Sequence, residues 1–245
     1  MALLEAKNLA QSYNGQEIIH NVSIELNEKE IVCLIGRSGV GKTTLFQILS
    51  GLHKPTNGQV FLDGEVITGQ AGKISYMLQK DMLLPYRTIE DNIALPLIIQ
   101  GAHKKEARAK IQHYFDEFGL EGTQKKYPSQ LSGGMRQRAA LLRTYMFSHK
   151  VVLLDEPFSA LDSITKLEMH KWYLKIMKKI ELSTIFVSHD IDEAIYLSNR
   201  VYVMAENPGT IVKEIPIIRT IKNRDEFSVS PEFLGYKKQL LSFLQ

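Results

Sequence analysis

The sequence predicts an α/β fold with an N-terminal antiparallel β subdomain and an α-helical insert. Apolar and polar residues alternate in the first 35 positions, most regularly from Val22 to Leu26, which is typical of strands. Strand and helix patterns then alternate on both sides of a helical stretch at about 88–148. We therefore expect one domain over 1–218, with the helical subdomain inside it, and a C-terminal extension over 219–245.

Composition indicates an ordinary globular chain. Its 245 residues are 44% hydrophobic and 23% charged. The net charge of +3 comes without a long block of one sign, so we expect no nucleic-acid partner. The single cysteine, Cys33, cannot form an internal disulfide, which fits a reducing compartment. We expect no secretion signal, because the start lacks a basic segment and a long apolar core, and no membrane span, because no apolar run approaches the roughly 20 residues that span a bilayer.

The pattern of apolar residues and glycines predicts the strands and the helix between residues 31 and 78. Residues 31–35 form a continuous apolar run, which predicts a strand buried on both faces. A glycine cluster separates this strand from a helix expected over 44–52. Strands follow at 59–67, with an Asp63-Gly64 turn, and at 73–78.

The insert and the second half are predicted from helical and strand periods. Ala107, Ile111, Tyr114 and Phe118 recur at helical spacing, and Gly119 is expected to end that helix. Further elements are expected as strands at 151–154, 184–187 and 200–205, and as helices at 164–180, 191–197 and 232–243.

A phosphate-binding loop is predicted between the buried strand and the next helix. Glycines let the backbone N–H groups turn toward phosphates, and the helix N-terminus adds partial positive charge. Lys42 would reach the β- and γ-phosphates, while the Thr43 hydroxyl would bind Mg²⁺. The pattern predicts a P-loop NTPase (RecA-like) core, and the loop residues are Gly36, Arg37, Ser38, Gly39, Val40, Gly41, Lys42, Thr43 and Thr44.

Two carboxylates end the apolar strand at 151–154. Asp155 is placed near the metal ion, and Glu156 near the attacking water. Glu156 is the candidate general base that takes the proton of this water. On position alone, a solvated carboxylate after a strand is the alternative interpretation.

A third motif narrows the class of P-loop protein. Leu131 to Gln137, which reads LSGGMRQ, resembles the signature motif of ATP-binding cassette (ABC) ATPases, and the resemblance covers nearly the whole chain. Ser132, Gly133 and Gly134 precede a helical pattern and would form a second anion-binding helix N-terminus. The resemblance implies that this motif serves the partner subunit's nucleotide, with two ATP between two head-to-tail subunits, expected to be a homodimer.

The resemblance implies four further site residues. Tyr13 resembles the aromatic residue that stacks on adenine, and Gln79 the residue that senses the metal and the γ-phosphate. Asp162 matches the cross-subunit loop, and His189 the switch histidine that contacts the γ-phosphate. Each type alone is more often structural, but the four match in order and spacing. The expected Mg²⁺ ligands are Thr43, Gln79 and Asp155, whereas no spacing predicts zinc.

The expected task is transport. Residues 80–130 are too few for the long coiled coil of chromosome and DNA-repair relatives, and the chain carries one cassette and no membrane span. The resemblance implies an ATPase subunit of a binding-protein-dependent importer, on the cytoplasmic face of the cell membrane. Its implied partners are a second ATPase subunit, a transmembrane permease and, indirectly, a solute-binding protein.

A finer resemblance concerns the solute. Residues 80–92, 206–211 and 230–233 are similar to the nitrate, sulfonate and taurine importer group, although Tyr86 replaces its usual tryptophan. Some members of that group are predicted to carry thiamine-precursor pyrimidines, so the solute stays open. The alternative is a nucleotide-gated assembly ATPase acting on a soluble partner, of the iron–sulfur assembly type. Apolar residues within 82–99 would suit a permease groove, or equally the core of the helical subdomain.

Overall fold

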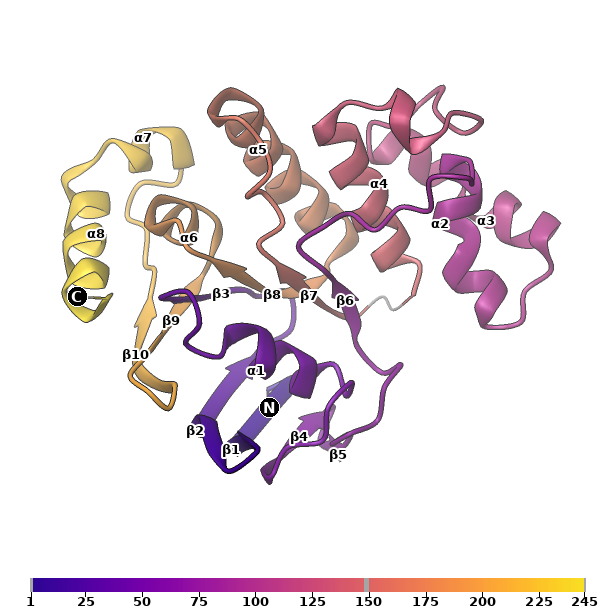
Figure 1. Ribbon diagram of the computed structural model, residues 1–245. Helices are drawn as coiled ribbons and strands as arrows, with labels where there is room; N and C mark the ends of the chain where they lie inside the picture. The colour runs from indigo at the N-terminus through magenta and orange to yellow at the C-terminus, as the bar shows by residue number, and fades with distance from the viewer. Residues whose placement is uncertain (1, 148–149, 245) are drawn as a thin grey trace. The chain divides into compact units, whose positions relative to one another are not determined.

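The computed structural model describes residues 2–147 and 150–244, which divide into two compact units. The first unit comprises residues 1–74 and 183–245, and the second comprises residues 75–182. Figure 1 shows the elements of each unit with their labels. Among these described residues, no helix combines the length and the apolar character needed to cross a membrane.

The first unit contains the predicted antiparallel β subdomain. The strand expected at 59–67 is divided at Asp63 and Gly64, whose φ values of +53° and +80° turn the chain back on itself. The remaining strand pairs of this sheet are also antiparallel. The sheet has the order β2-β1-β4-β5, formed by β1 (Leu4–Tyr13), β2 (Gln16–Leu26), β4 (Asn57–Leu62) and β5 (Glu65–Val66).

A second group of strands in this unit surrounds the buried strand predicted at 31–35. That strand, β3, lies between two parallel neighbours and is buried along its whole length, as expected. A fourth strand pairs antiparallel with β9. The order is β10-β9-β3-β8, with β3 (Ile31–Gly36), β8 (Ser183–Ser188), β9 (Arg200–Ala205) and β10 (Thr210–Pro216).

The helices of the first unit differ from the expected ones mainly at their ends. The first begins at Lys42 rather than at 44, and it stops short of 52 because Gly51, with a φ of +76°, follows its C-cap. A short helix begins after Asn223, whose side chain caps it, and was not predicted. The helices are α1 (Lys42–Leu49), α6 (Ile191–Leu197), α7 (Arg224–Ser228) and α8 (Pro231–Leu244).

The second unit carries the helical insert and two parallel strands. The stretch expected at 88–148 contains three helices and one 3-10 turn, and its predicted end at 148 lies outside the described residues. As expected, Gly119 follows the end of α3, with a φ of +64°. The elements are β6 (Ser75–Met77), α2 (Ile89–Ile99), α3 (Lys104–Glu117), η1 (Pro128–Gln130), α4 (Gly133–Tyr145), β7 (Val151–Asp155) and α5 (Ser163–Ile180).

Candidate active site

The predicted phosphate loop joins β3 to α1 in the first unit. Gly39 and Gly41 have φ values of +82° and +106°, a backbone region that side chains with a Cβ rarely adopt. A Cβ on Gly36 would lie 2.3 Å from the carbonyl oxygen of Met204, and one on Gly41 would lie 2.6 Å from a side chain of β2. The backbone therefore requires glycine at these positions, and the predicted strand–loop–helix arrangement is present.

Lys42 contributes a buried positive charge to this loop. Its side chain is largely buried, and its ammonium donates hydrogen bonds of 2.8 Å to the carbonyl oxygens of Gly36 and Arg37. The first turn of α1 holds no acidic residue, so the partial positive charge of the helix N-terminus is not offset there. The exposed Thr43 follows directly. This end of α1 suits the phosphate groups of a nucleotide.

His189 directly follows strand β8, at the edge of the sheet where β3 ends and the phosphate loop begins. Ile35 of β3 pairs in parallel with Ser188 of β8, so His189 follows beside Gly36. The N–H of Asp190 donates to Ser188 Oγ at 3.0 Å, and the Asp190 carboxylate caps α6. The backbone around His189 is thereby fixed, and its side chain is exposed at this edge.

A cavity of about 610 Å³ lies against the phosphate loop within the first unit. This volume falls in the range of small-molecule sites. Apart from the loop, its walls were not predicted from the sequence. They are formed by 37–40 of the loop, Gln16 and Ile18 of β2, Ala205 at the end of β9 with the next residues 206–207, and Phe243 and Leu244 at the end of α8.

Tyr13, the predicted adenine-stacking residue, lies at the end of β1. It is paired across the sheet with Gln16, which lines the cavity, while Tyr13 itself does not. Its hydroxyl forms a hydrogen bond of 2.9 Å with the ring of His53, and 38% of the residue is exposed. The ring is thus held next to a wall of the cavity with part of its surface open to a base.

Asp155 ends the buried strand β7 in the second unit and is itself only 8% exposed. The Tyr76 hydroxyl donates a hydrogen bond of 3.2 Å to its Oδ2. Burial, together with the charge and hydrogen bond of Asp155, raises the pKa of Tyr76 above its ordinary value, so the phenol stays protonated and donating. One oxygen of Asp155 is therefore oriented by Tyr76, a residue that the sequence interpretation missed.

Glu156 and Gln79 are brought together at the ends of β7 and β6. These strands are parallel, with Met77 paired to Leu154, so the residues that follow them leave at one edge. Gln79 Nε2 donates a hydrogen bond of 2.9 Å to Glu156 Oε2. Glu156 is half-buried and has a φ of +46°. A carboxylate held in this way can accept a proton from a water molecule.

Ser132 caps α4, as the sequence predicts. Its hydroxyl accepts a hydrogen bond of 3.3 Å from the N–H of Met135, and the first turn holds no acidic residue. A Cβ on Gly133 would lie 3.5 Å from the side chain of Leu161, and one on Gly134 equally close to that of Thr165. The two glycines thus sit close to the segment that begins α5.

Asp162 has a local role that the resemblance does not imply. Its carboxylate caps α5 by accepting hydrogen bonds from the N–H groups of Ile164 at 3.2 Å and Thr165 at 3.0 Å. Hydrogen bonds from Thr165 lower the pKa of this exposed carboxyl below its ordinary value. Asp162 therefore fixes the loop between β7 and α5 in its ionised form.

The predicted site residues fall into two groups, one in each unit. Within the described chain, no three His, Cys, Asp or Glu residues cluster as a metal site. Mg²⁺ prefers oxygen ligands and usually needs few from the protein, so the Thr43 hydroxyl of the first unit and the Gln79 amide and Asp155 carboxylate of the second stay its predicted ligands. The first unit holds Tyr13, the loop 36–44 and His189; the second holds Gln79, Ser132, Gly133, Gly134, Asp155, Glu156 and Asp162.

Comparisons with known proteins identify the family. Residues 19–159 match the ABC transporter family. The chain is 42% identical over 225 residues to a formylaminopyrimidine import ATP-binding protein of Halalkalibacterium halodurans, covering 91% of this chain and 88% of the relative. It is 37% identical to a nitrate import ATP-binding protein of Synechocystis, covering 99% and 95%. An aliphatic sulfonates import ATP-binding protein of Bacillus cereus is 39% identical, covering 91% and 88%.

A solved structure agrees with these relatives. The dimeric ATP-binding cassette MJ0796, in a post-hydrolysis state with ADP and inorganic phosphate, aligns with a TM-score of 0.73 and 27% identity. The alignment covers 88% of this chain and 99% of that cassette. The P-loop NTPase fold predicted from the sequence is confirmed. The chain belongs to the ABC transporter family and is an ATPase that uses ATP, with Mg²⁺ as the usual ion.

Proposed function

We propose that this chain is the ATP-hydrolysing subunit of a binding-protein-dependent importer that acts on a separate permease at the cytoplasmic face of the cell membrane. The observation that carries the proposal is a constrained, solvent-exposed apolar segment in the second unit. The three relatives described above are named as import ATP-binding proteins, which supports the same direction of transport.

The apolar segment comprises residues 81–88 and is called the docking segment below. Tyr86 is 93% exposed and Met82 is 56% exposed, while Leu84 is exposed to a smaller degree. Burial in the core of the helical subdomain, which the sequence left open, applies to Leu83 but not to these three side chains. An exposed apolar group of this kind marks a surface for another apolar partner.

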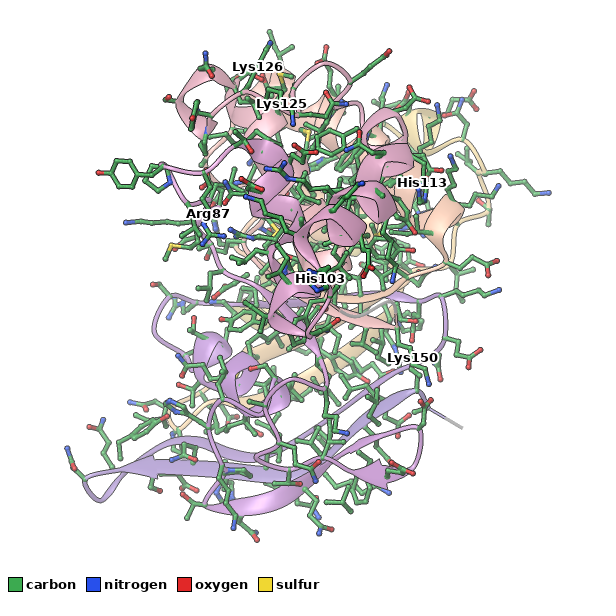
Figure 2. The ribbon with its side chains drawn as sticks, turned by 90° about the vertical axis from the view of Figure 1, so that its right-hand side faces the viewer. Arg87, His103, His113, Lys125, Lys126 and Lys150 are labelled. Atoms are coloured by element: carbon green, nitrogen blue, oxygen red, sulfur yellow. The ribbon has the colours of Figure 1, made fainter. Side chains whose placement is uncertain are left out.

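Hydrogen bonds hold the backbone of the docking segment in place. Arg143 of α4 donates to the carbonyl oxygens of Asp81 at 2.5 Å and Met82 at 2.7 Å. The Asn92 amide accepts from the N–H of Leu84 at 2.6 Å and donates to the carbonyls of Leu84, Arg87 and Thr88. These hydrogen bonds constrain the backbone of the segment before binding, which lowers the entropy cost of binding a permease helix. Figure 2 shows Arg87 of this segment at the surface of the second unit.

The proposed cycle uses two copies of the chain. The phosphate loop of one copy and Ser132 to Gly134 of the other would hold the same ATP, as the dimeric state of the MJ0796 cassette suggests. ATP then closes the pair because it makes more contacts in the closed state than in the open one. Hydrolysis, with Glu156 as general base and Gln79 and Asp155 at the metal, removes these contacts and reopens the pair.

The names of the relatives suggest nitrate, an aliphatic sulfonate or a formylaminopyrimidine as the solute. The solute would meet the permease and a solute-binding protein rather than this subunit. Extraction of the small molecule from a co-purified binding protein identifies it directly.

Capture from detergent-solubilised source membranes tests the proposal. We expect the wild-type chain to retain a multi-span permease and a solute-binding protein, identified by mass spectrometry. Tyr86→Ala should retain less permease at unchanged ATPase activity of the isolated subunit. Val229→Ala, at an exposed apolar position in the other unit, is the control. Recovery of soluble proteins alone would overturn the importer proposal in favour of the assembly ATPase.

A further inference from the structure

The C-terminal helix α8 is anchored along its length within the first unit. Phe233 and Leu240 are buried, and α8 packs on α6 and β9. Lys237 Nζ lies 2.7 Å from Asp192 Oδ1, in the first turn of α6. The Tyr236 hydroxyl forms hydrogen bonds of 3.0 Å with both the N–H and the carbonyl of Ile218. The end of the helix is therefore positioned by contacts that precede it.

The last turn of α8 reaches the cavity at the phosphate loop. Phe243 and Leu244 line this cavity together with Arg37 to Val40. Lys213 Nζ of β10 lies 5.9 Å from the centre of the Phe243 ring, within the range of a cation–π contact. Two segments that are some 200 positions apart in sequence thus share one cavity.

The cavity is lined by both polar and apolar residues, and Glu206 is the one acidic residue among those that line it. The phosphate loop contributes backbone N–H groups and the Arg37 side chain, which suit an anion. Ile18, Phe243 and Leu244 contribute apolar side chains. A nucleotide combines the same two kinds of group, because its phosphates are charged whereas its sugar carbons and base are not.

We propose that Phe243 and Leu244 are nucleotide-binding residues that contact the sugar of bound ATP and make α8 part of the ATP site. Tyr13, next to Gln16 at this cavity, then receives the base. The proposal rests on nucleotide binding at the phosphate loop. The two side chains line a cavity of about 610 Å³, which leaves room for a small molecule beside them. Bound nucleotide should in turn order the last turn of α8.

Titration calorimetry with a non-hydrolysable ATP analogue and Mg²⁺ tests this wall. Phe243→Ala should raise the Kd about fivefold to tenfold, since it removes most of an apolar contact. Phe243→Leu should restore most of the affinity. Leu241→Ala, on the same helix at an exposed position outside the cavity, should leave the Kd unchanged. Deletion of α8 is unsuitable because Phe233 and Leu240 are buried.

Hydrogen exchange gives a second measurement. A purely structural role of Phe243 would not make the exchange of neighbouring amides depend on bound nucleotide. Amides of residues 240–244 should exchange more slowly when the analogue is bound, in the wild type and in Leu241→Ala but not in Phe243→Ala. An unchanged or lower Kd for Phe243→Ala, with the wild type binding normally, would overturn the proposal. Failure of the wild type itself to bind would instead overturn nucleotide binding at the loop.

Discussion

The side-chain amide of Gln79 donates a hydrogen bond of 2.9 Å to the carboxylate of Glu156, so the two predicted hydrolysis residues of the second unit are in direct contact. The contact orients the carboxylate and links it to the strand β6. A water molecule or Mg²⁺ that displaces this hydrogen bond would change the position of both side chains together.

Replacement of the candidate general base should separate binding from hydrolysis. We expect Glu156→Gln to bind ATP with unchanged affinity and to hydrolyse it about 10²- to 10⁴-fold more slowly, because the amide cannot accept the proton of water. Phosphate release and calorimetry measure the two properties, and size-exclusion chromatography with ATP should show an accumulated dimer. Wild-type turnover in this variant would refute the assignment of Glu156.

Removal of the Lys42 ammonium from the phosphate loop should weaken ATP binding. Lys42→Ala loses a buried cation that the carbonyls of Gly36 and Arg37 position, so we expect the Kd for Mg-ATP to rise about a hundredfold. Lys126→Ala, at an exposed lysine of the second unit (Figure 2), is the control for loss of charge. Equal affinities of the two variants would contradict this role.

His189 should affect rate rather than affinity. His189→Ala removes a donor expected at the γ-phosphate, while the hydrogen bonds of the flanking Ser188 and Asp190 side chains remain. We expect turnover to fall about 10²-fold, with the Kd for ATP within a factor of about three. Steady-state ATPase rates and calorimetry check both values. A variant with unchanged turnover would exclude this contact.

An ion-pair cluster of the helical subdomain should make its stability depend on pH. Burial favours protonation of Asp91, but hydrogen bonds from Arg108 and Lys104 outweigh it and lower the pKa of Asp91 below 3.8. The stabilisation is therefore present above the unfolded pKa and is lost as the pH falls through the lower folded pKa. Asp91→Asn should lower the free energy of unfolding by about 1–2 kcal/mol at pH 7.

Urea unfolding followed at pH 7 and at successively lower pH measures this effect. The difference between wild type and Asp91→Asn should shrink toward zero below pH 4. Asp116→Asn, at an exposed carboxylate of α3, should change the stability little at either pH. A pH-independent difference between wild type and Asp91→Asn would show that packing, not charge, is responsible.

Most elements of the fold could be predicted because their signals are local. The buried run at β3, the glycine loop and the cap at Ser132 each depend on residues that are neighbours in sequence. The short helix α7 was missed because its signal is one capping residue, Asn223, without an apolar period. Helix ends were misplaced where backbone conformation, as at Gly51, decides them rather than side-chain pattern.

The candidate site was predictable only in part, for a related reason. The loop and the strand-end carboxylates follow from motif and spacing, whereas the contact of Tyr76 with Asp155 depends on the parallel pairing of β6 and β7. The walls given by Gln16 and Phe243 depend on long-range packing in the same way. No sequence period indicates which residue a distant strand or helix brings to a cavity.

The helix α4 connects the signature motif at Ser132 to the docking segment. Its 13 residues follow the Ser132 cap, and near its other end Arg143 donates hydrogen bonds to the backbone of the docking segment. An α-helix of this length, about 20 Å, behaves as a stiff rod without an internal joint. If a permease displaces the docking segment, as we propose, the Ser132 end should therefore tilt as well. The movement would then pass along the helix itself rather than through flexible loops. A proline in the middle of α4 would kink the helix and uncouple its two ends.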